Sequence, residues 1–435
     1  MESFIFRIEK KISGSLGRAG VLETPHGRIE TPTFVVVGTK GTIKSLSPEQ
    51  VKDLGTQVVL ANTYHLYLEP GDEIVRDAGG LHTFMNWNGP TMTDSGGFQA
   101  FSLGADFNKK VGKISVTRTD ADAKSADTAD ENIGSQEEPT LAKITEDGVA
   151  FKSYRDGSEH FFTPERSIEI QHNIGADMIF AFDECTSPHA SYEYQKEAMD
   201  RTHRWATRSL AAHRSLATQN VAEQTQKSIG EILRKSASVP HGSALIPHSS
   251  ALFGIVQGGR FEDLRKESAR MIGGMDFDGF GIGGSFDKDD MYTTVRWVNE
   301  LLPEEKPRHL LGIGEPADLF GAVENGCDLF DCVAPTRMAR NGTLHTKNGR
   351  INISNAMFRN DFGPIDEGCE CYTCKNYTRA YVAHLFRSKE MFAATLASIH
   401  NLYFIVHLVK NIRQSILDGQ FKKYRAKFLS EYYKE

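Results

Sequence analysis

The sequence predicts an α/β protein built as a (β/α)8 barrel, followed by a small metal-binding unit. Eight short apolar runs, poor in charge, alternate with segments of helical period between residues 32 and 335. Each run ends in glycine or polar residues, as do strands buried on both faces of a parallel sheet. Three cysteines then crowd together after residue 367. An open doubly wound sheet is the alternative to a barrel.

The expected elements follow one another in a regular order. The strands are predicted at residues 32–39, 57–65, 90–97, 176–185, 251–259, 277–285, 308–316 and 327–335. Helical segments are predicted at residues 47–55, 71–85, 163–175, 193–216, 260–275, 290–303 and 315–326. Several of these segments open with Ser, Thr, Asp or Pro, which is typical of helix starts.

Two stretches interrupt this alternation. Residues 106–141 are rich in small and acidic residues and poor in large apolar ones, so we expect a flexible surface insertion. Residues 215–250 end in a stretch rich in Ser and Pro, which predicts a second loop insertion. The predicted domains are a catalytic barrel over 1–367, a metal-binding subdomain with a closing helix over 368–417, and a basic, aromatic tail over 418–435.

Composition is that of a soluble globular protein. The 435 residues are 39% hydrophobic and 25% charged, without an apolar run of membrane-spanning length. The N-terminal "MESFIFRIEKKISG" has charges inside its apolar patch and no cleavage site of small residues, so we expect a cytoplasmic protein without a membrane partner. A net charge of -7 argues against a uniformly basic nucleic-acid-coating protein but allows a local basic patch.

Polar residues at the strand ends are the first candidates for chemistry, because barrel enzymes build their sites there. They are Asp94, Asp183, Glu184, Gln257, Gly283, Gly284, Glu315 and Asp331. Any single one of these could instead cap a helix or bond to a loop. Two separated carboxylates, one attacking and one transferring protons, suit cleavage of a glycosidic bond, so glycoside or nucleoside chemistry is predicted.

Paired glycines occur at three of these ends, at 96–97, 258–259 and 283–284. Glycine lets the backbone approach a flat ligand, although Gly-Gly also serves plain turns. The phosphate-binding pattern GxxxxGK[ST] does not occur in the sequence.

The sharpest local motif is "CECYTC", which carries Cys369, Cys371 and Cys374. Three thiolates this close lack one ligand for a closed, tetrahedral, structural zinc site. Spacing leaves His384, His400 and His407 as candidates for that ligand.

Basic residues near Asp331 suggest a further contact. Arg337 and Arg340 suit a phosphodiester backbone, or they form a solvated pair on a helix. The C-terminal "GQFKKYRAKFLSEYYKE" either touches RNA or is an amphipathic surface helix.

From about residue 5 to 417, apart from the two insertions, the chain resembles the tRNA-guanine transglycosylases (queuine tRNA-ribosyltransferases). The shared motifs, in order, are "TPTFVVVGT", "ANTYHL", "TDSGGFQAFSL", "DGVAFKSYRDGS", "FDEC", "GIVQGG", "HLLGIGEP", "FDCVAPTRMARNG" and "CECYTC". The resemblance implies an irregular (β/α)8 (TIM) barrel with a C-terminal zinc-binding subdomain, one structural Zn²⁺ per subunit and a homodimer. It implies exchange of guanine at the wobble position of tRNAs with G-U-N anticodons for a 7-deazaguanine base.

The resemblance also implies residue roles. Asp331 matches the nucleophile that attacks the ribose, and Asp94 matches the general acid/base. Asp183 would accept hydrogen bonds from the purine, while Gln257 and the Gly284 N–H would bond its carbonyl oxygen. Phe98 would cover the base, and the remaining substrate-binding positions are Ser95, Gly96 and Gly97.

Two segments match RNA contacts. They comprise Gly312, Ile313, Gly314, Glu315, Pro316, Ala317 and Asp318, then Thr336, Arg337, Met338, Ala339 and Arg340. The fourth zinc ligand of the family matches His400.

Two features depart from the family pattern. The segment "SFDKDDMY" after Gly284 leaves open whether 7-aminomethyl-7-deazaguanine or queuine is inserted. Glu315 stands where a basic residue is common. The rival functions are a glycosidase or nucleosidase acting on small substrates and a non-catalytic partner subunit; the presence of both Asp94 and Asp331 argues against the latter.

Overall fold

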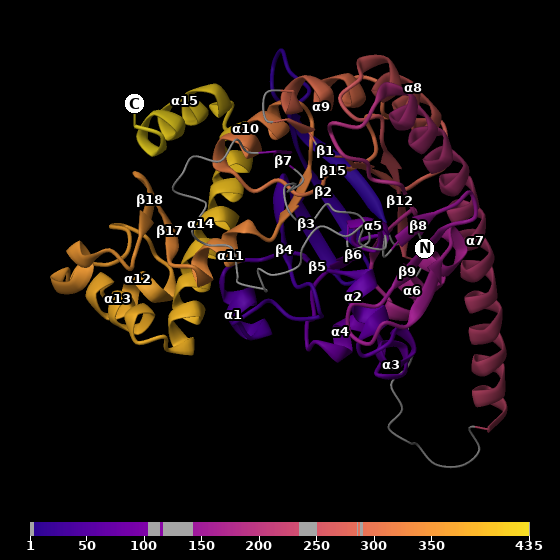
Figure 1. The fold of residues 1–435 in the computed structure, drawn as a ribbon, viewed down its shortest axis with the longest axis horizontal. Helices are drawn as coiled ribbons and strands as arrows, with labels where there is room; N and C mark the ends of the chain where they lie inside the picture. Colours follow the sequence, from indigo (N-terminus) through magenta and orange to yellow (C-terminus); the bar gives the residue numbers. More distant parts are fainter. Residues whose placement is uncertain are drawn as a thin grey trace, which may run out of the picture.

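Eight parallel strands close into a barrel in the computed structural model (Figure 1), which describes residues 4–102, 114–115, 142–234, 250–284, 286–287 and 290–434. Around the barrel, the strands follow the order β11-β12-β13-β15-β16-β4-β5-β6. They are β4 (Thr33–Val37), β5 (Val59–Ala61), β6 (Thr91–Thr93), β11 (Met178–Phe180), β12 (Ala251–Val256), β13 (Gly279–Ile282), β15 (Arg308–Leu310) and β16 (Leu329–Cys332). Each strand lies inside one of the eight predicted apolar runs. The barrel prediction is therefore confirmed, and the open sheet is excluded.

Helices follow most of the strands. They are α1 (Pro48–Asp53), α2 (Thr63–Leu68), α3 (Asp72–Asp77), α4 (Gly80–Phe84), α5 (Gly97–Ser102), α6 (Pro164–Ile174), α7 (Tyr192–Arg234), α8 (Glu262–Gly273), α9 (Met291–Asn299) and α10 (Pro316–Glu324). Helix α7 runs 18 residues past the predicted end at residue 216, so the first part of the second insertion is helical. The rest of that insertion, from 235 to 249, lies outside the described residues, as does 106–141 apart from β7 (Ile114–Ser115).

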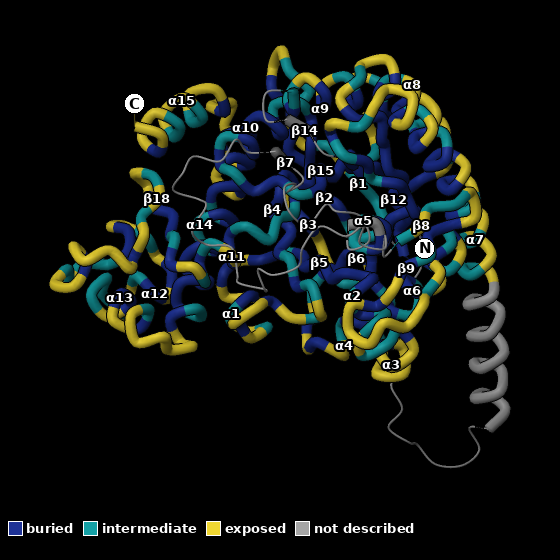
Figure 2. Tube along the Cα trace, in the orientation of Figure 1, coloured by how far each residue is buried: buried dark blue, intermediate teal, exposed yellow. Residues whose placement is uncertain are grey.

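Two apolar cores hold the barrel. One fills its interior, and the other lies between the strands and the helices. The antiparallel sheet β1 (Ile5–Lys11), β2 (Arg18–Thr24) and β3 (Gly27–Thr31) packs Leu22 and Ile29 onto the interior core. Figure 2 shows the barrel strands as the most continuously buried part of the chain. Smaller additions are β8 (Ala142–Ile144), β9 (Val149–Lys152), β10 (Glu159–Phe162) and β14 (Phe286–Asp287).

The C-terminal part stands beside the barrel, on the side away from α7 (Figure 1). It contains α11 (Ala334–Arg340), the hairpin β17 (Thr343–Thr346) and β18 (Gly349–Asn352), η3 (Ala356–Asn360), α12 (Tyr372–Asn376), α13 (Arg379–Arg387), α14 (Met391–Leu417) and α15 (Phe421–Tyr432). In the described part of the chain, α14 alone is long and apolar enough to cross a membrane. Of its most apolar 18-residue window, 67% is buried inside the protein, and Arg413 at its end bonds to the carbonyl of Thr31. It is therefore a core helix that joins the C-terminal unit to the barrel.

The last helix, α15, covers α10. Phe320 of α10 lies against Phe421, Tyr424 and Phe428, with ring centroids 5.5 to 6.1 Å apart. Lys422, Lys423 and Lys427 of the same helix are exposed. The predicted tail is therefore amphipathic, with its aromatic side turned to the barrel.

Asp177 holds together the seam between β6 and β11 at the N-terminal ends of these two strands. Its Oδ2 accepts a hydrogen bond of 2.8 Å from the Thr91 N–H, and the Asp177 N–H donates to Thr91 Oγ1 at 3.3 Å. His26 and His82 reach the same carboxylate at 2.7 and 3.1 Å. Burial alone would raise the pKa of Asp177, but the hydrogen bonds from His26 and His82 hold it well below its usual value.

These three side chains are also close enough together to share a metal ion. The two imidazole rings, however, stack with centroids 3.4 Å apart and planes 20° apart. Stacked rings direct their nitrogen lone pairs side by side, whereas a shared ion needs them to converge. We therefore interpret the His26, His82 and Asp177 group as a structural hydrogen-bond cluster.

We expect Asp177→Asn to lower the free energy of unfolding at pH 7 by about 3 kcal/mol, because a buried charged acceptor is lost. A carboxylate with a lowered folded-state pKa stabilises fully above its unfolded pKa, and that contribution declines progressively as the pH falls from about 4 towards the lowered folded-state pKa. Urea unfolding of both proteins between pH 7 and pH 3 measures how far the difference in their free energies of unfolding narrows as the pH falls. The exposed Asp53→Asn is the matched control, and a difference that is independent of pH would contradict the assignment.

Candidate active site and metal cluster

A pocket opens at the mouth of the barrel, where the strands end. It is lined by Asp94, Ser95, Phe98, Gln99, Phe180, Asp183, Cys185, Ile255, Gln257, Gly283, Gly284 and Leu311. These residues come from or directly follow five different strands, so only closure of the barrel brings them together. Six of the eight predicted substrate-binding residues are among them: Asp94, Ser95, Phe98, Asp183, Gln257 and Gly284. Gly96 and Gly97 do not line the pocket.

Asp94 follows β6 and is held by the start of α2. Its Oδ1 accepts a hydrogen bond of 2.9 Å from the Thr63 N–H. Its Oδ2 accepts from the Asn62 amide, and from Gln99 Nε2 at 3.1 Å. Asn62 also caps α2 by accepting from the His65 N–H. The carboxylate that is predicted to move protons therefore has a fixed orientation.

The two glycines after Ser95 permit the turn from β6 into α5. Gly96 has a φ of 76°, and a Cβ there would lie 3.2 Å from the Tyr64 nitrogen. A residue with a side chain would be strained at this position and would also crowd the neighbouring backbone. Gly97 begins α5, which carries Phe98 to the pocket wall.

Asp183 forms the polar floor of the pocket. Its Oδ1 accepts from Ser95 Oγ at 3.0 Å, and its Oδ2 accepts from Gln257 Nε2 at 2.6 Å. Only 7% of Asp183 and 2% of Gln257 is exposed. A carboxylate beside an amide presents acceptors and donors side by side, which matches the hydrogen-bonding edge of a guanine.

Arg265 of α8 supports the opposite wall of the pocket. Its fully buried guanidinium donates to the carbonyls of Gly259 at 2.6 Å and Gly283 at 2.8 Å. Burial lowers its pKa to about 9, with nearby Cys185 acting in the opposite direction. Gly284 has a φ of 98°, and a Cβ there would lie 2.6 Å from Arg265 Nη2, so this position requires glycine.

Asp331 lies near the end of β16. Its Oδ1 accepts a hydrogen bond of 2.9 Å from His309 Nε2 and one of 3.2 Å from the Gly312 N–H. His309 is fully buried, whereas 13% of the Asp331 side chain is exposed. Asp331 does not line the pocket itself but is linked to it, because the His309 ring packs against Phe180 with centroids 5.5 Å apart.

Besides Asp331, two further strand-end carboxylates stay outside the pocket, and these two have structural partners. Glu184 is buried, where it pairs with Arg201 and accepts from Tyr194 Oη at 2.7 Å. Glu315 pairs with Arg350 of β18 and accepts from Tyr433. The expectation that all the strand-end carboxylates share one mouth is therefore wrong for these two, because each has a structural partner.

The predicted RNA segments lie on two neighbouring parts of the surface. Residues 312–318 connect β15 to α10, and Asp318 there is buried and accepts from Tyr292 Oη at 3.0 Å. Residues 336–340 belong to α11, where Arg337 is exposed and Arg340 is half-buried. Six of these twelve residues are buried and Arg337 alone is exposed, so Arg337 is the most accessible side chain of the two segments.

Sequence reasoning missed the residues that hold the site from behind. Asn62, Gln99, Arg265 and His309 all bond to a predicted site residue or to its backbone. His309 had a usable signal, since a histidine inside an apolar strand needs a buried partner. Arg265 sits on an ordinary amphipathic helix, and its pattern gave no such signal.

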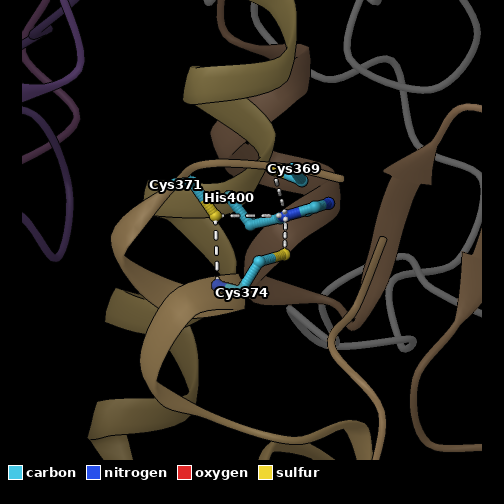
Figure 3. A group of neighbouring side chains, drawn as sticks. All are labelled: Cys369, Cys371, Cys374 and His400. Carbon is cyan, nitrogen blue, oxygen red and sulfur yellow. Dashed lines mark hydrogen bonds between the residues drawn. The ribbon is translucent and has the colours of Figure 1, made fainter. Parts of the chain in front are cut away.

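The three cysteines and His400 meet in one cluster (Figure 3). The Sγ atoms of Cys369, Cys371 and Cys374 lie 3.9, 3.5 and 3.3 Å from His400 Nδ1. A tetrahedral ion with metal–sulfur bonds of about 2.3 Å and metal–nitrogen bonds of about 2.0 Å separates sulfur and nitrogen ligands by roughly 3.6 Å. The four residues therefore could hold a metal ion, and of the three candidate histidines His400 is the one that meets the cysteines.

The hairpin β17–β18 orients the histidine of the cluster. His400 Nε2 donates to the His345 carbonyl at 2.6 Å, which directs Nδ1 towards the cysteines. The His345 ring in turn bonds to Tyr432 Oη of α15 at 2.6 Å. Burial lowers the pKa of His345 to about 3, so its ring is neutral. Of the rival ligands, His384 is exposed, and His407 bonds to the Tyr403 carbonyl at 3.0 Å.

The mouth of this barrel holds two separated carboxylates, Asp94 at the pocket and Asp331 beside His309, and such a pair suits an enzyme that breaks and re-forms glycosidic bonds. Comparison with known sequences identifies the family to which the chain belongs. The family model described as queuine tRNA-ribosyltransferase matches residues 13–137 and 127–434. The chain belongs to this family, whose members are pentosyltransferases.

Full-length relatives agree with that assignment. The queuine tRNA-ribosyltransferase of Thermoanaerobacter pseudethanolicus is 44% identical over 439 residues, which cover 100% of both chains. The protein of the same name from Desulforamulus reducens is 43% identical over 426 residues, 97% of each chain. That of Streptococcus suis is 43% identical over 430 residues, 98% of this chain and 96% of its own.

We expect the purified protein to carry about one metal ion per chain and Cys371→Ser to retain less than about a tenth of it, because a hydroxyl replaces a soft, buried ligand. Elemental analysis of both proteins measures the content and identifies the metal. Cys185→Ser, which changes a cysteine outside the cluster, is the control and should keep the ion. An unchanged metal content in Cys371→Ser would show that the ion binds elsewhere.

Proposed function

We propose that this transglycosylase exchanges guanine at the wobble position of tRNAs with G-U-N anticodons for a 7-deazaguanine base, a step of queuosine biosynthesis. These are the tRNAs for aspartate, asparagine, histidine and tyrosine. The observation that carries the proposal is the pocket in which Asp183 and Gln257 present an acceptor and a donor side by side, within a chain of this family. We infer a cytoplasmic location, where tRNA is modified.

In the proposed reaction, Asp331 attacks C1′ of the ribose while the C1′–N9 bond breaks. Asp94 supplies the proton that the departing guanine takes up. The incoming base then loses a proton to Asp94, and its nitrogen displaces the Asp331 oxygen from C1′. The hydrogen bonds from Asn62 and from Thr63 support this role, because they fix Asp94 in one orientation.

The groups that we propose for base recognition already form hydrogen bonds with one another. Asp183 accepts from Ser95 and Gln257, so a guanine that binds there has to replace these donors with its own N–H groups. The second N–H of the Gln257 amide and the Gly284 N–H would then meet the purine carbonyl. The pocket segment at 285–289 lies largely outside the described residues, so both 7-aminomethyl-7-deazaguanine and queuine remain candidates for the incoming base.

For the metal cluster we propose a structural Zn²⁺, one per subunit. Three cysteines and one histidine fill every position of a tetrahedral ion and leave none for water or substrate. Bound zinc would tie the loop at residues 369–374 to the long helix α14.

We also propose that the protein acts as a homodimer. Tyr372, Tyr381 and Phe392 are exposed on the zinc subdomain and, with Tyr377, form one aromatic patch with ring centroids 5.4 to 5.9 Å apart. Exposed aromatic patches of this kind are typical of protein interfaces. The molar mass in solution tests this part of the proposal.

The function is tested by incubating the full-length, metal-loaded protein with tRNA that carries labelled guanine at the wobble position. We expect the label to be released when either deazaguanine is added, and the more efficient base identifies the substrate. A tRNA whose wobble guanine is not followed by uridine is the control and should keep its label. If no G-U-N tRNA exchanges guanine with any of the bases, the proposal is wrong.

Two variants separate chemistry from recognition. We expect Asp331→Asn to abolish the covalent RNA adduct seen on denaturing gels, because an amide cannot replace the carboxylate as nucleophile. We expect Asp183→Asn to raise KM for guanine about tenfold to hundredfold while an adduct still forms, because one partner of the base is lost. Adduct formation by Asp331→Asn would contradict the assignment of the nucleophile.

A further inference from the structure

A buried histidine lies directly behind the predicted nucleophile. His309 belongs to β15, and its Nε2 lies 2.9 Å from Asp331 Oδ1. The same oxygen accepts the Gly312 N–H at 3.2 Å. One carboxylate oxygen of Asp331 therefore carries two hydrogen bonds, both from groups of the neighbouring strand and its following turn.

The histidine has little freedom to move. Its side chain is fully buried, and its backbone pairs in register with Gly281 on one side and Leu329 on the other. The ring meets Phe180 edge to face at 70°, and Phe180 lines the base pocket. Because an ionised carboxylate can only accept, His309 must carry a proton on Nε2.

We propose that His309 is a positioning residue that sets how readily Asp331 leaves the ribose after the covalent step. This inference rests on the proposed function, because it assigns a role within that reaction. Asp331 Oδ1 is held by two donors, and attack through Oδ2 leaves both hydrogen bonds in place. His309 and Gly312 thus fix the orientation of the carboxylate.

The electron balance explains the effect on the second half of the reaction. In the first half, Asp331 Oδ2 donates an electron pair to C1′, and the C1′–N9 pair passes to the purine, which takes a proton from Asp94. In the second half, the incoming nitrogen bonds to C1′, and the C1′–O pair returns to Asp331. A full negative charge then re-forms on the carboxylate, where the N–H groups of His309 and Gly312 stabilise it.

These donors therefore act in opposite directions on the two halves. They stabilise the free carboxylate, which makes Asp331 a less reactive nucleophile and a better leaving group. Removing the His309 donor should slow release of the ribose without slowing its capture, so that the covalent intermediate accumulates. A merely structural role would predict the reverse, since a misplaced carboxylate forms less adduct.

The test compares wild type with His309→Leu and His309→Gln at saturating incoming base, over a range of tRNA concentrations up to saturation. Leucine removes the donor at similar volume, whereas glutamine places an amide N–H near the position of the histidine Nε2–H. For His309→Leu we expect kcat to fall about tenfold to hundredfold, KM for tRNA to stay within about twofold, and the fraction of enzyme trapped as RNA adduct to rise. His309→Gln should restore most of the turnover and the low adduct level.

Two results would overturn the inference. One is a His309→Leu variant with wild-type turnover and adduct level. The other is a variant that forms less adduct, is not rescued by His309→Gln and shows a lowered unfolding temperature, which is the signature of a structural residue. Failure of the proposed function is distinguishable from both, because the wild type itself would then exchange no guanine.

Discussion

The architecture of this protein depends on the closure of its barrel between β6 and β11. These strands are separated in sequence by more than 80 residues and have one registered pair, Met92 with Met178. Asp177 strengthens this short seam from below through Thr91, and two histidines hold its carboxylate. At the upper end of the same seam, Ser95 bonds to Asp183. The seam between β6 and β11 thus closes the barrel and also brings two of the site residues together.

The sequence predicted the barrel well because each strand is buried on both faces. An apolar run such as "ALFGIV" can be recognised without knowledge of its neighbours, and β12 coincides with it. Helix α7 was harder, because the polar stretch "TQNVAEQTQK" at 218–227 separates its first part from the short amphipathic run that follows, so the pattern does not predict one continuous helix. The N-terminal sheet was not predicted, since its strands alternate irregularly and depend on the barrel interior for their apolar partners.

The candidate site, like the fold, could be predicted from the sequence only in part. Groups that face the pocket, such as Asp94 and Asp183, stand at strand ends, where the fold itself indicates a role. Glu184 and Glu315 stand at similar positions, and only their partners Arg201 and Arg350 show that they serve the structure. Those partners are 17 and 35 residues away in sequence. Long-range pairing of this kind leaves no local pattern, so strand-end position alone overstates the number of functional carboxylates.

The path from Tyr432 through His345 to His400 couples the cysteine cluster mechanically to the barrel. The carbonyl that orients His400 belongs to a residue whose ring bonds to Tyr432 of α15. Helix α15 in turn packs on Phe320 of α10. A displacement of α15 from α10 would therefore reach the cluster through two hydrogen bonds, a path that needs no direct contact between the cluster and the barrel strands.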